Sequence, residues 1–188
     1  MTGRIFLKGG TSYTAHRVSL TLYANIDDLE VFIRDPRHEA RADGKIRIGR
    51  KIFSCSGTLA ILIDRRIGTT IEPGHKRFVY DLGYRNTSGA IDHFYGTKYC
   101  DSDSPKGVWH DTTTAYFYLA SREDESERRL GAGILRISPL GFVRELLSLR
   151  ARDAGPFGAV AALMRFFRFF VAQCFDTYCR NIIDYGPF

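Results

Sequence analysis

The fold is decided by residues 88–121, SGAIDHFYGTKYCDSDSPKGVWHDTTTAYFYLAS. Both ends of this stretch alternate in character as β-strands do, because successive side chains of a strand point to opposite faces. The even-numbered residues 92–98 share one face of the first strand, and the odd-numbered residues 113–119 share one face of the second. The connector CDSDSPKG is rich in the Asp, Ser, Pro and Gly residues typical of loops. The stretch therefore predicts two strands joined by a long hairpin loop.

Other strand patterns surround this hairpin. The run RVSLTLYA, residues 17–24, alternates apolar and polar side chains, and residues 76–85 do the same. The run SGTLAILID, residues 56–64, is almost continuously apolar, which is typical of a strand covered on both faces. Shorter strands are predicted at residues 4–8, 45–48, 51–56 and 131–137. The pair Asp43-Gly44 predicts a tight turn.

Helical patterns appear at three places. A short helix is predicted after Asn25, ending at Pro36, and a second begins at Ser138-Pro139. The third and longest covers residues 157–181, with arginines in its middle that argue against a membrane span. Phenylalanines occupy much of its circumference, so we expect it to be buried against the sheet. The alternatives are contact with a partner, a membrane surface or a bound lipid.

These elements predict an α+β protein that is mainly antiparallel β. One domain, residues 1–188, is expected, with a β-rich part at 1–137 and a helical C-terminal part at 138–188. About eight strands would form a barrel or a two-layer sandwich, followed by two C-terminal helices.

Composition narrows the classes of function. Apolar residues make up 44% and charged residues 26% of the chain, as in ordinary globular proteins. The net charge is +6, but the basic residues are scattered, so no nucleic-acid partner is expected. The N-terminus lacks the apolar run of a signal peptide, which predicts a cytoplasmic location. The cysteines have no metal-binding spacing, and free buried thiols, no metal and no cofactor are expected. They are Cys55, Cys100, Cys174 and Cys179.

Several phrases resemble a known family in the same order along the chain. They are LTLYANIDDLEVFIRDPRHEARADGKIRIG, SGTLAILID, GTKYCDSDSPKGVWHDTTTAYFYL, AGILRISPLGFVRELLSLR and MRFFRFFVAQCFDTY. The most specific pieces are Gly96–Lys98, Trp109–Thr113 and Gly133–Ile137. The sequence resembles the accessory β-rich domain of bacterial cholesterol-oxidase-like (glucose-methanol-choline type) oxidoreductases.

The chain lacks two motifs that would indicate the enzymatic parts of such proteins. It has neither a G-x-G-x-x-G dinucleotide fingerprint nor a G-x-S-x-G nucleophile elbow. The resemblance therefore implies a stand-alone relative of the accessory domain, not an oxidase or a hydrolase. It also implies proximity to sterols or other apolar substrates.

The candidate site is drawn mainly from the central hairpin. A lysine beside a carboxylate inside a barrel would orient a carbonyl or phosphate, and a nearby histidine would exchange protons near neutral pH. The candidate catalytic residues are Lys98, His110, Asp111 and Asp92. The candidate ligand-binding residues are Tyr80, Tyr84, Tyr95, Trp109, Thr113, Phe167 and Phe170. The alternative is structural: Lys98 in an ion pair, with Asp111 and Thr113 capping the loop.

Three hypotheses of function follow. The first is a barrel that binds an apolar small molecule of sterol, terpenoid or polyketide-like chemistry, within a biosynthetic or oxidative pathway. The second is a cofactor-free isomerase or cyclase that uses the same cavity. The third is an interaction module for a separate oxidoreductase. A homodimer and peripheral contact with a membrane are further alternatives for the Phe-rich helix.

Overall fold

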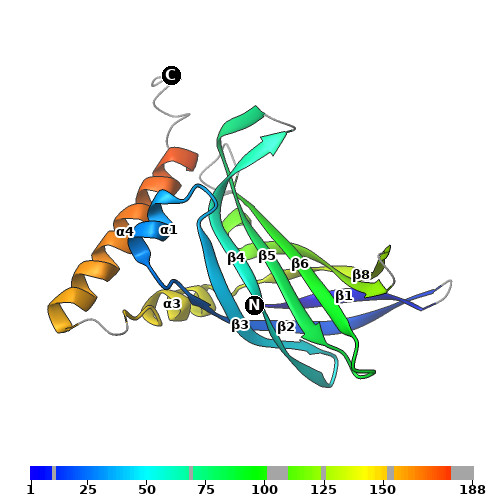
Figure 1. Ribbon diagram of the computed structural model, residues 1–188. Coiled ribbons are helices and arrows are strands. Elements are labelled where there is room, and N and C mark those ends of the chain that lie inside the picture. The colour runs from blue at the N-terminus through cyan, green and yellow to red at the C-terminus, as the bar shows by residue number, and fades with distance from the viewer. Residues whose placement is uncertain (10–11, 68–69, 101–109, 124–125, 152–154, 179–188) are drawn as a thin grey trace.

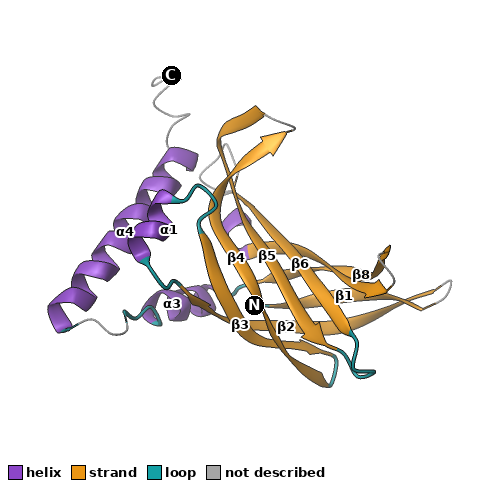
Figure 2. Cartoon of the chain, viewed as in Figure 1, coloured by secondary structure: helices purple, strands orange, loops and turns teal. Residues whose placement is uncertain are grey.

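Eight antiparallel strands form a closed barrel in the computed structural model (Figures 1 and 2). The strands are β1 (Thr2–Gly9), β2 (Ser12–Asn25), β3 (Glu39–Ile48), β4 (Lys51–Ile67), β5 (Thr70–Arg85), β6 (Ile91–Cys100), β7 (Thr114–Glu123) and β8 (Ser126–Arg136). Each strand pairs with its neighbours in sequence, and β8 closes the barrel by pairing with β1. The structure describes residues 1–9, 12–67, 70–100, 110–123, 126–151 and 155–178. The predicted fold class is confirmed, and of its two architectures the barrel is the one that forms.

The alternation predicted for the central hairpin is confirmed in β6 and β7. Along β6 the even-numbered residues 92–100 are buried, while their odd-numbered neighbours are half-buried or exposed. Phe117 on the inward face of β7 stacks on Phe94, with ring centroids 4.8 Å apart. Aromatic rings from adjacent strands therefore fill the middle of the barrel, where they are removed from water.

Small residues stand opposite the large ones. Phe117 pairs with Gly96 on β6 and with Gly133 on β8. A Cβ atom on Gly96 would lie 2.8 Å from the ring of Phe94, and one on Gly133 would lie 2.9 Å from the ring of Phe117. Large and small side chains thus alternate around the barrel, as the limited interior of an eight-stranded barrel requires.

Among the described residues, α1 (Leu29–Arg34), α3 (Pro139–Leu147) and α4 (Pro156–Tyr178) lie outside the strands, together with a single helical turn at 110–113. The side chain of Asp28 caps α1 by accepting hydrogen bonds from the backbone of Glu30 and Val31. Helix α4 packs against α1 and β5 at one end of the barrel (Figure 1). The ring of Phe169 on α4 contacts His38 and Phe32, with centroids 4.8 and 5.6 Å away.

Two local expectations are wrong. The pair Asp43-Gly44 is not a turn but lies within β3, which is hydrogen-bonded on both sides. A Cβ atom on Gly44 would lie 2.0 Å from the backbone oxygen of Thr21, so the glycine permits a close approach of two strands. Helix α4 is not buried against the sheet. Only 6% of the residues in its 18-residue apolar segment are buried, because the helix packs against the protein through one face alone.

Two free cysteines make stability depend on pH in the alkaline range. Burial raises the pKa of both Cys55 and Cys174 from 9.0 to about 11, and for Cys55 the charge of Asp43 adds to the effect. The folded protein therefore keeps these thiols protonated at pH values where the unfolded chain ionises them. We expect the contribution of these two thiols to the free energy of unfolding to be constant below pH 9 and to fall between pH 9 and about 11.

Urea unfolding at a series of pH values measures this change. The double variant Cys55→Ala, Cys174→Ala is expected to show a smaller fall over the same range, even though it is less stable at neutral pH. An equal fall in the wild type and the variant would assign the alkaline loss to other groups.

Candidate functional site

A recess of about 330 Å³ opens at one mouth of the barrel. This mouth is at the opposite end of the barrel from α4 (Figure 1). Every strand except β2, or a turn next to it, contributes a lining residue, so the recess is centred on the barrel axis. The lining residues are Leu7, Lys8, Ile48, Lys51, Phe53, Tyr84, Asn86, Thr87, Ser88, Asp92, Leu119 and Leu130.

Asp92 gives the recess its main polar feature. The residue is only 5% exposed, and its Oδ1 atom is buried without a hydrogen-bond partner. It lies opposite Tyr84 on β5 and opposite Ser121 on β7. Burial, and after it the nearby Asp92 carboxylate, raise the pKa of Tyr84, so this tyrosine keeps its proton. A buried acceptor without a partner is costly, and a ligand carrying a donor would satisfy it.

The rest of the recess is mostly apolar on the inside and basic at the rim. Phe53 and Tyr84 pack together with ring centroids 5.2 Å apart. The exposed lysines Lys8 and Lys51 stand at the rim. This arrangement suits an apolar molecule that carries a hydrogen-bond donor at its inner end. The lysines at the rim would also accept a negative charge at the outer end of that molecule.

The turn between β5 and β6 fixes one side of the rim. The Oδ1 atom of Asn86 accepts hydrogen bonds from the backbone of Ser88 and Ala90 and from the Ser88 hydroxyl, at 2.9, 3.1 and 2.7 Å. The guanidinium of Arg85 donates to the carbonyl of Gly89 at 2.9 Å. These bonds hold the turn in one conformation, so this part of the rim is preformed.

Lys98 lies at the other end of the same strand. It is six positions from Asp92 on β6, which corresponds to about 20 Å along the strand. Its ammonium group donates to the carbonyl of Thr112 at 3.3 Å and lies 5.4 and 6.0 Å from the ring centroids of Phe78 and Tyr80. Lys98 and Asp92 therefore share one face of β6, as predicted, and that face points into the barrel, but the two side chains are too far apart to act on one reacting group.

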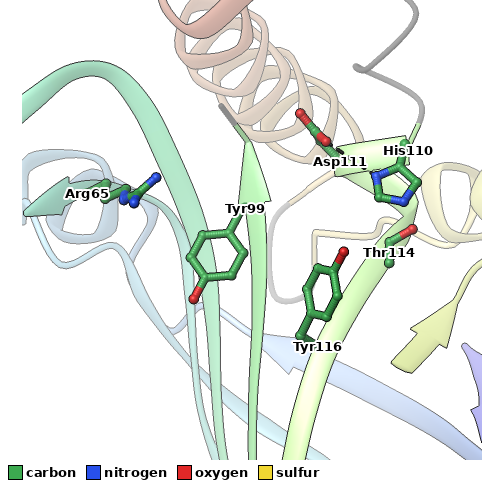
Figure 3. A pocket seen from close by; sticks show the side chains of 6 residues that line it. All are labelled: Arg65, Tyr99, His110, Asp111, Thr114 and Tyr116. Atoms are coloured by element: carbon green, nitrogen blue, oxygen red, sulfur yellow. Dashed lines mark ion pairs between the residues drawn. The ribbon is translucent and has the colours of Figure 1, made fainter. Parts of the chain in front are cut away.

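The other two candidate catalytic residues line a second pocket, of about 280 Å³, on the outer surface of the barrel (Figure 3). His110 Nδ1 lies 3.5 Å from Asp111 Oδ1. The other walls are Arg65, Tyr99, Thr114 and Tyr116. Tyr99 and Tyr116 point outward from β6 and β7 with ring centroids 6.3 Å apart. The four candidate catalytic residues are thus divided among three places and do not form one site.

The candidate ligand-binding residues are also divided. Tyr84 lines the mouth recess, whereas Tyr80 is buried farther inside, near Lys98. Tyr95 faces outward and stacks on His93. The Thr113 hydroxyl donates to the carbonyl of His110 at 3.4 Å, which agrees with the loop-capping alternative. Trp109 lies outside the described residues.

Phe167 and Phe170 belong to α4 and are remote from the recess (Figure 1). Phe170 is partly buried against the core, while Phe167 is 37% exposed. Neither residue lines either of the two pockets described above.

Sequence reasoning missed the apolar walls of the mouth. They are Leu7, Ile48, Phe53, Leu119 and Leu130. The available signal was their position: Leu7 and Ile48 are among the last inward-facing residues before a turn, and such residues surround an open end of a barrel. Using that signal requires the strand pairing to be known.

The chain was compared with models of protein families, with curated proteins and with solved structures. None of the three comparisons found a match.

Proposed function

We propose that this protein binds an apolar small molecule, of sterol, terpenoid or polyketide-like chemistry, in the mouth of its barrel. The observation that carries the proposal is the buried, unpartnered Oδ1 atom of Asp92 in the wall of a recess that is mostly apolar on the inside and polar at the rim. The ligand would present a hydroxyl or amine to Asp92 and lie against Leu119 and Leu130.

The size of the recess supports a small ligand or one end of a larger one. Its volume of about 330 Å³ is at the lower end of the roughly 300–1,000 Å³ found for ligand pockets. Deeper in the barrel, Phe94 and Phe117 occupy the space between the strands. The ligand therefore enters only the mouth, and any remaining part projects past the lysines at the rim.

Binding is favoured over the alternative of a cofactor-free isomerase or cyclase. That reaction needs an acid and a base on the same substrate, within hydrogen-bonding reach of the reacting atoms. Asp92 is the one candidate catalytic residue that lines the recess. Lys98 lies about 20 Å farther along the strand, and His110 lies in the outer pocket.

The test measures binding to a pair of ligands that differ only in a hydroxyl group. A thermal-shift screen of sterols, terpenoids and polyketides, with native mass spectrometry of the purified protein, selects the ligand. We expect Asp92→Leu to weaken binding of the hydroxylated compound about 10–100-fold, because a hydrogen bond to a charged group is worth about 1.5–3 kcal/mol. Binding of the deoxy analogue should change little.

Two further variants serve as controls. Asp81→Asn alters a carboxylate on the neighbouring strand that faces outward and is half-exposed, so ligand affinity should be unchanged. Leu130→Trp fills the recess and should abolish binding of both compounds. The proposal is wrong if a bound apolar molecule survives Leu130→Trp, or if Asp92→Leu weakens the hydroxylated and deoxy compounds equally.

A further inference from the structure

Helix α4 carries an apolar stripe on the side facing away from the barrel. Its members recur every three or four residues, so they fall on one face of the helix. They are Phe157, Val160, Met164, Phe167, Val171 and Phe175. Their exposed fractions range from 37% for Phe167 to 92% for Phe157. A continuous exposed apolar stripe of this kind marks an interaction surface.

The opposite face of α4 is held by the protein. Phe169 is 7% exposed and Thr177 is 4% exposed, and Phe166 and Phe170 pack against the core. Arg165 donates to Glu30 on α1 at 2.8 Å. The helix is long and apolar enough to cross a membrane, but crossing would pull this packed face away from α1 and β5. One face on the protein and one face exposed is the arrangement of a helix that lies in the plane of a membrane surface.

Charge distinguishes a membrane from a second copy of this chain. Exposed Arg168 is three residues from Val171 and four from Met164, so it borders the stripe. The one acidic residue on α4 is Asp176, which lies 3.6 Å from Lys76 in an ion pair. Two α4 helices packed stripe to stripe would place the Arg168 side chains of both copies beside the interface, while Asp176 on each helix is already paired with Lys76. A surface of anionic lipids offers the complementary charge.

We propose that α4 attaches this protein to the surface of an anionic membrane. The stripe enters the boundary between headgroups and acyl chains, and Arg168 contacts lipid phosphates. The net charge of +6 adds a general attraction to such a surface. The mouth of the barrel lies at the other end of the molecule, so attachment leaves the recess open to solvent (Figure 1). This proposal does not depend on the ligand-binding function.

Co-sedimentation with vesicles tests the attachment. We expect the protein to bind vesicles of phosphatidylcholine mixed with phosphatidylglycerol more tightly than vesicles of phosphatidylcholine alone. Met164→Glu should weaken binding at least about tenfold, because an apolar side chain that leaves water for the bilayer is replaced by a charge that the acyl chains exclude. Arg168→Gln should weaken binding to the mixed vesicles about fivefold, since one basic residue near an anionic surface contributes about that factor.

Tyr23→Glu is the matched control. Tyr23 is 69% exposed on the barrel wall, close to the 67% of Met164. Both substitutions therefore replace an exposed large side chain with a carboxylate, one on the barrel wall and the other on α4. It should leave vesicle binding unchanged. Equal binding to both kinds of vesicle, or an equal loss in Tyr23→Glu and Met164→Glu, would contradict the proposal. A dimer in solution that Met164→Glu dissociates, with no vesicle binding, would assign the stripe to a second copy.

Discussion

Phe94→Ala is expected to destabilise the protein by about 3–5 kcal/mol, the usual range for removing a buried phenylalanine. Phe94 is 1% exposed, stacks on Phe117 and covers the space above Gly96. Alanine would leave a cavity in the middle of the barrel, where the surrounding strands are hydrogen-bonded on both sides and cannot easily close in.

Urea unfolding and thermal melting measure this loss, which corresponds to roughly 6–20 °C in Tm for a chain of this size. The matched control is Tyr99→Ala, which removes an aromatic ring from the outward face of the same strand. Tyr99 is 40% exposed, so its loss should cost about 1 kcal/mol or less. Equal losses in the two variants would mean that the middle of the barrel does not depend on its aromatic packing.

The fold was largely predictable because its strands alternate regularly. Period-two patterns showed which residues of β6 and β7 share a face, Asp92 with Lys98 and Phe117 with Leu119, but not which of the two faces points inward. The pair Asp43-Gly44 misled the prediction because a glycine required for close strand approach has the same local sequence as one in a turn. Closure was not predictable either, since the pairing of β8 with β1 joins segments more than a hundred residues apart.

The candidate site was predictable only in part. Alternation tells which face a residue occupies but not at which end of the barrel it lies. It therefore grouped Asp92 with Lys98, although the two lie at opposite ends of β6. His110 and Asp111 are close to Lys98 in the predicted hairpin, yet they lie on the outside of the barrel. The position of a residue along the barrel axis depends on the register of strand pairing, which cannot be read from the sequence alone.

The helix α4 shows a similar limit. Its sequence contains two apolar stripes, one through Phe169 and the other through Met164, on opposite sides of the helix. Composition alone shows that the helix is apolar nearly all round, and this suggested burial. The stripes differ in exposure only because α1 and β5 cover one of them. Tertiary packing therefore decides which stripe is buried and which is exposed.

Gly133→Val is expected to destabilise the protein by about 3 kcal/mol or more, at the upper end of the cost of overpacking. A Cβ atom at this position would lie 2.2 Å from the backbone oxygen of Arg4 and 2.9 Å from the ring of Phe117. The first contact is with the backbone of β1, which cannot rotate away as a side chain can. The new atoms would therefore force β1 and β8 apart where they close the barrel.

Ala132→Val provides the control because it adds the same branched side chain to the adjacent residue on the outward face. Ala132 is exposed, so we expect a change within about 0.5 kcal/mol. Circular dichroism with urea unfolding compares the two variants, and a failure of Gly133→Val alone to fold also agrees with the prediction. A Gly133→Val protein as stable as Ala132→Val would contradict the prediction. It would mean that β1 and β8 can move apart without loss of stability.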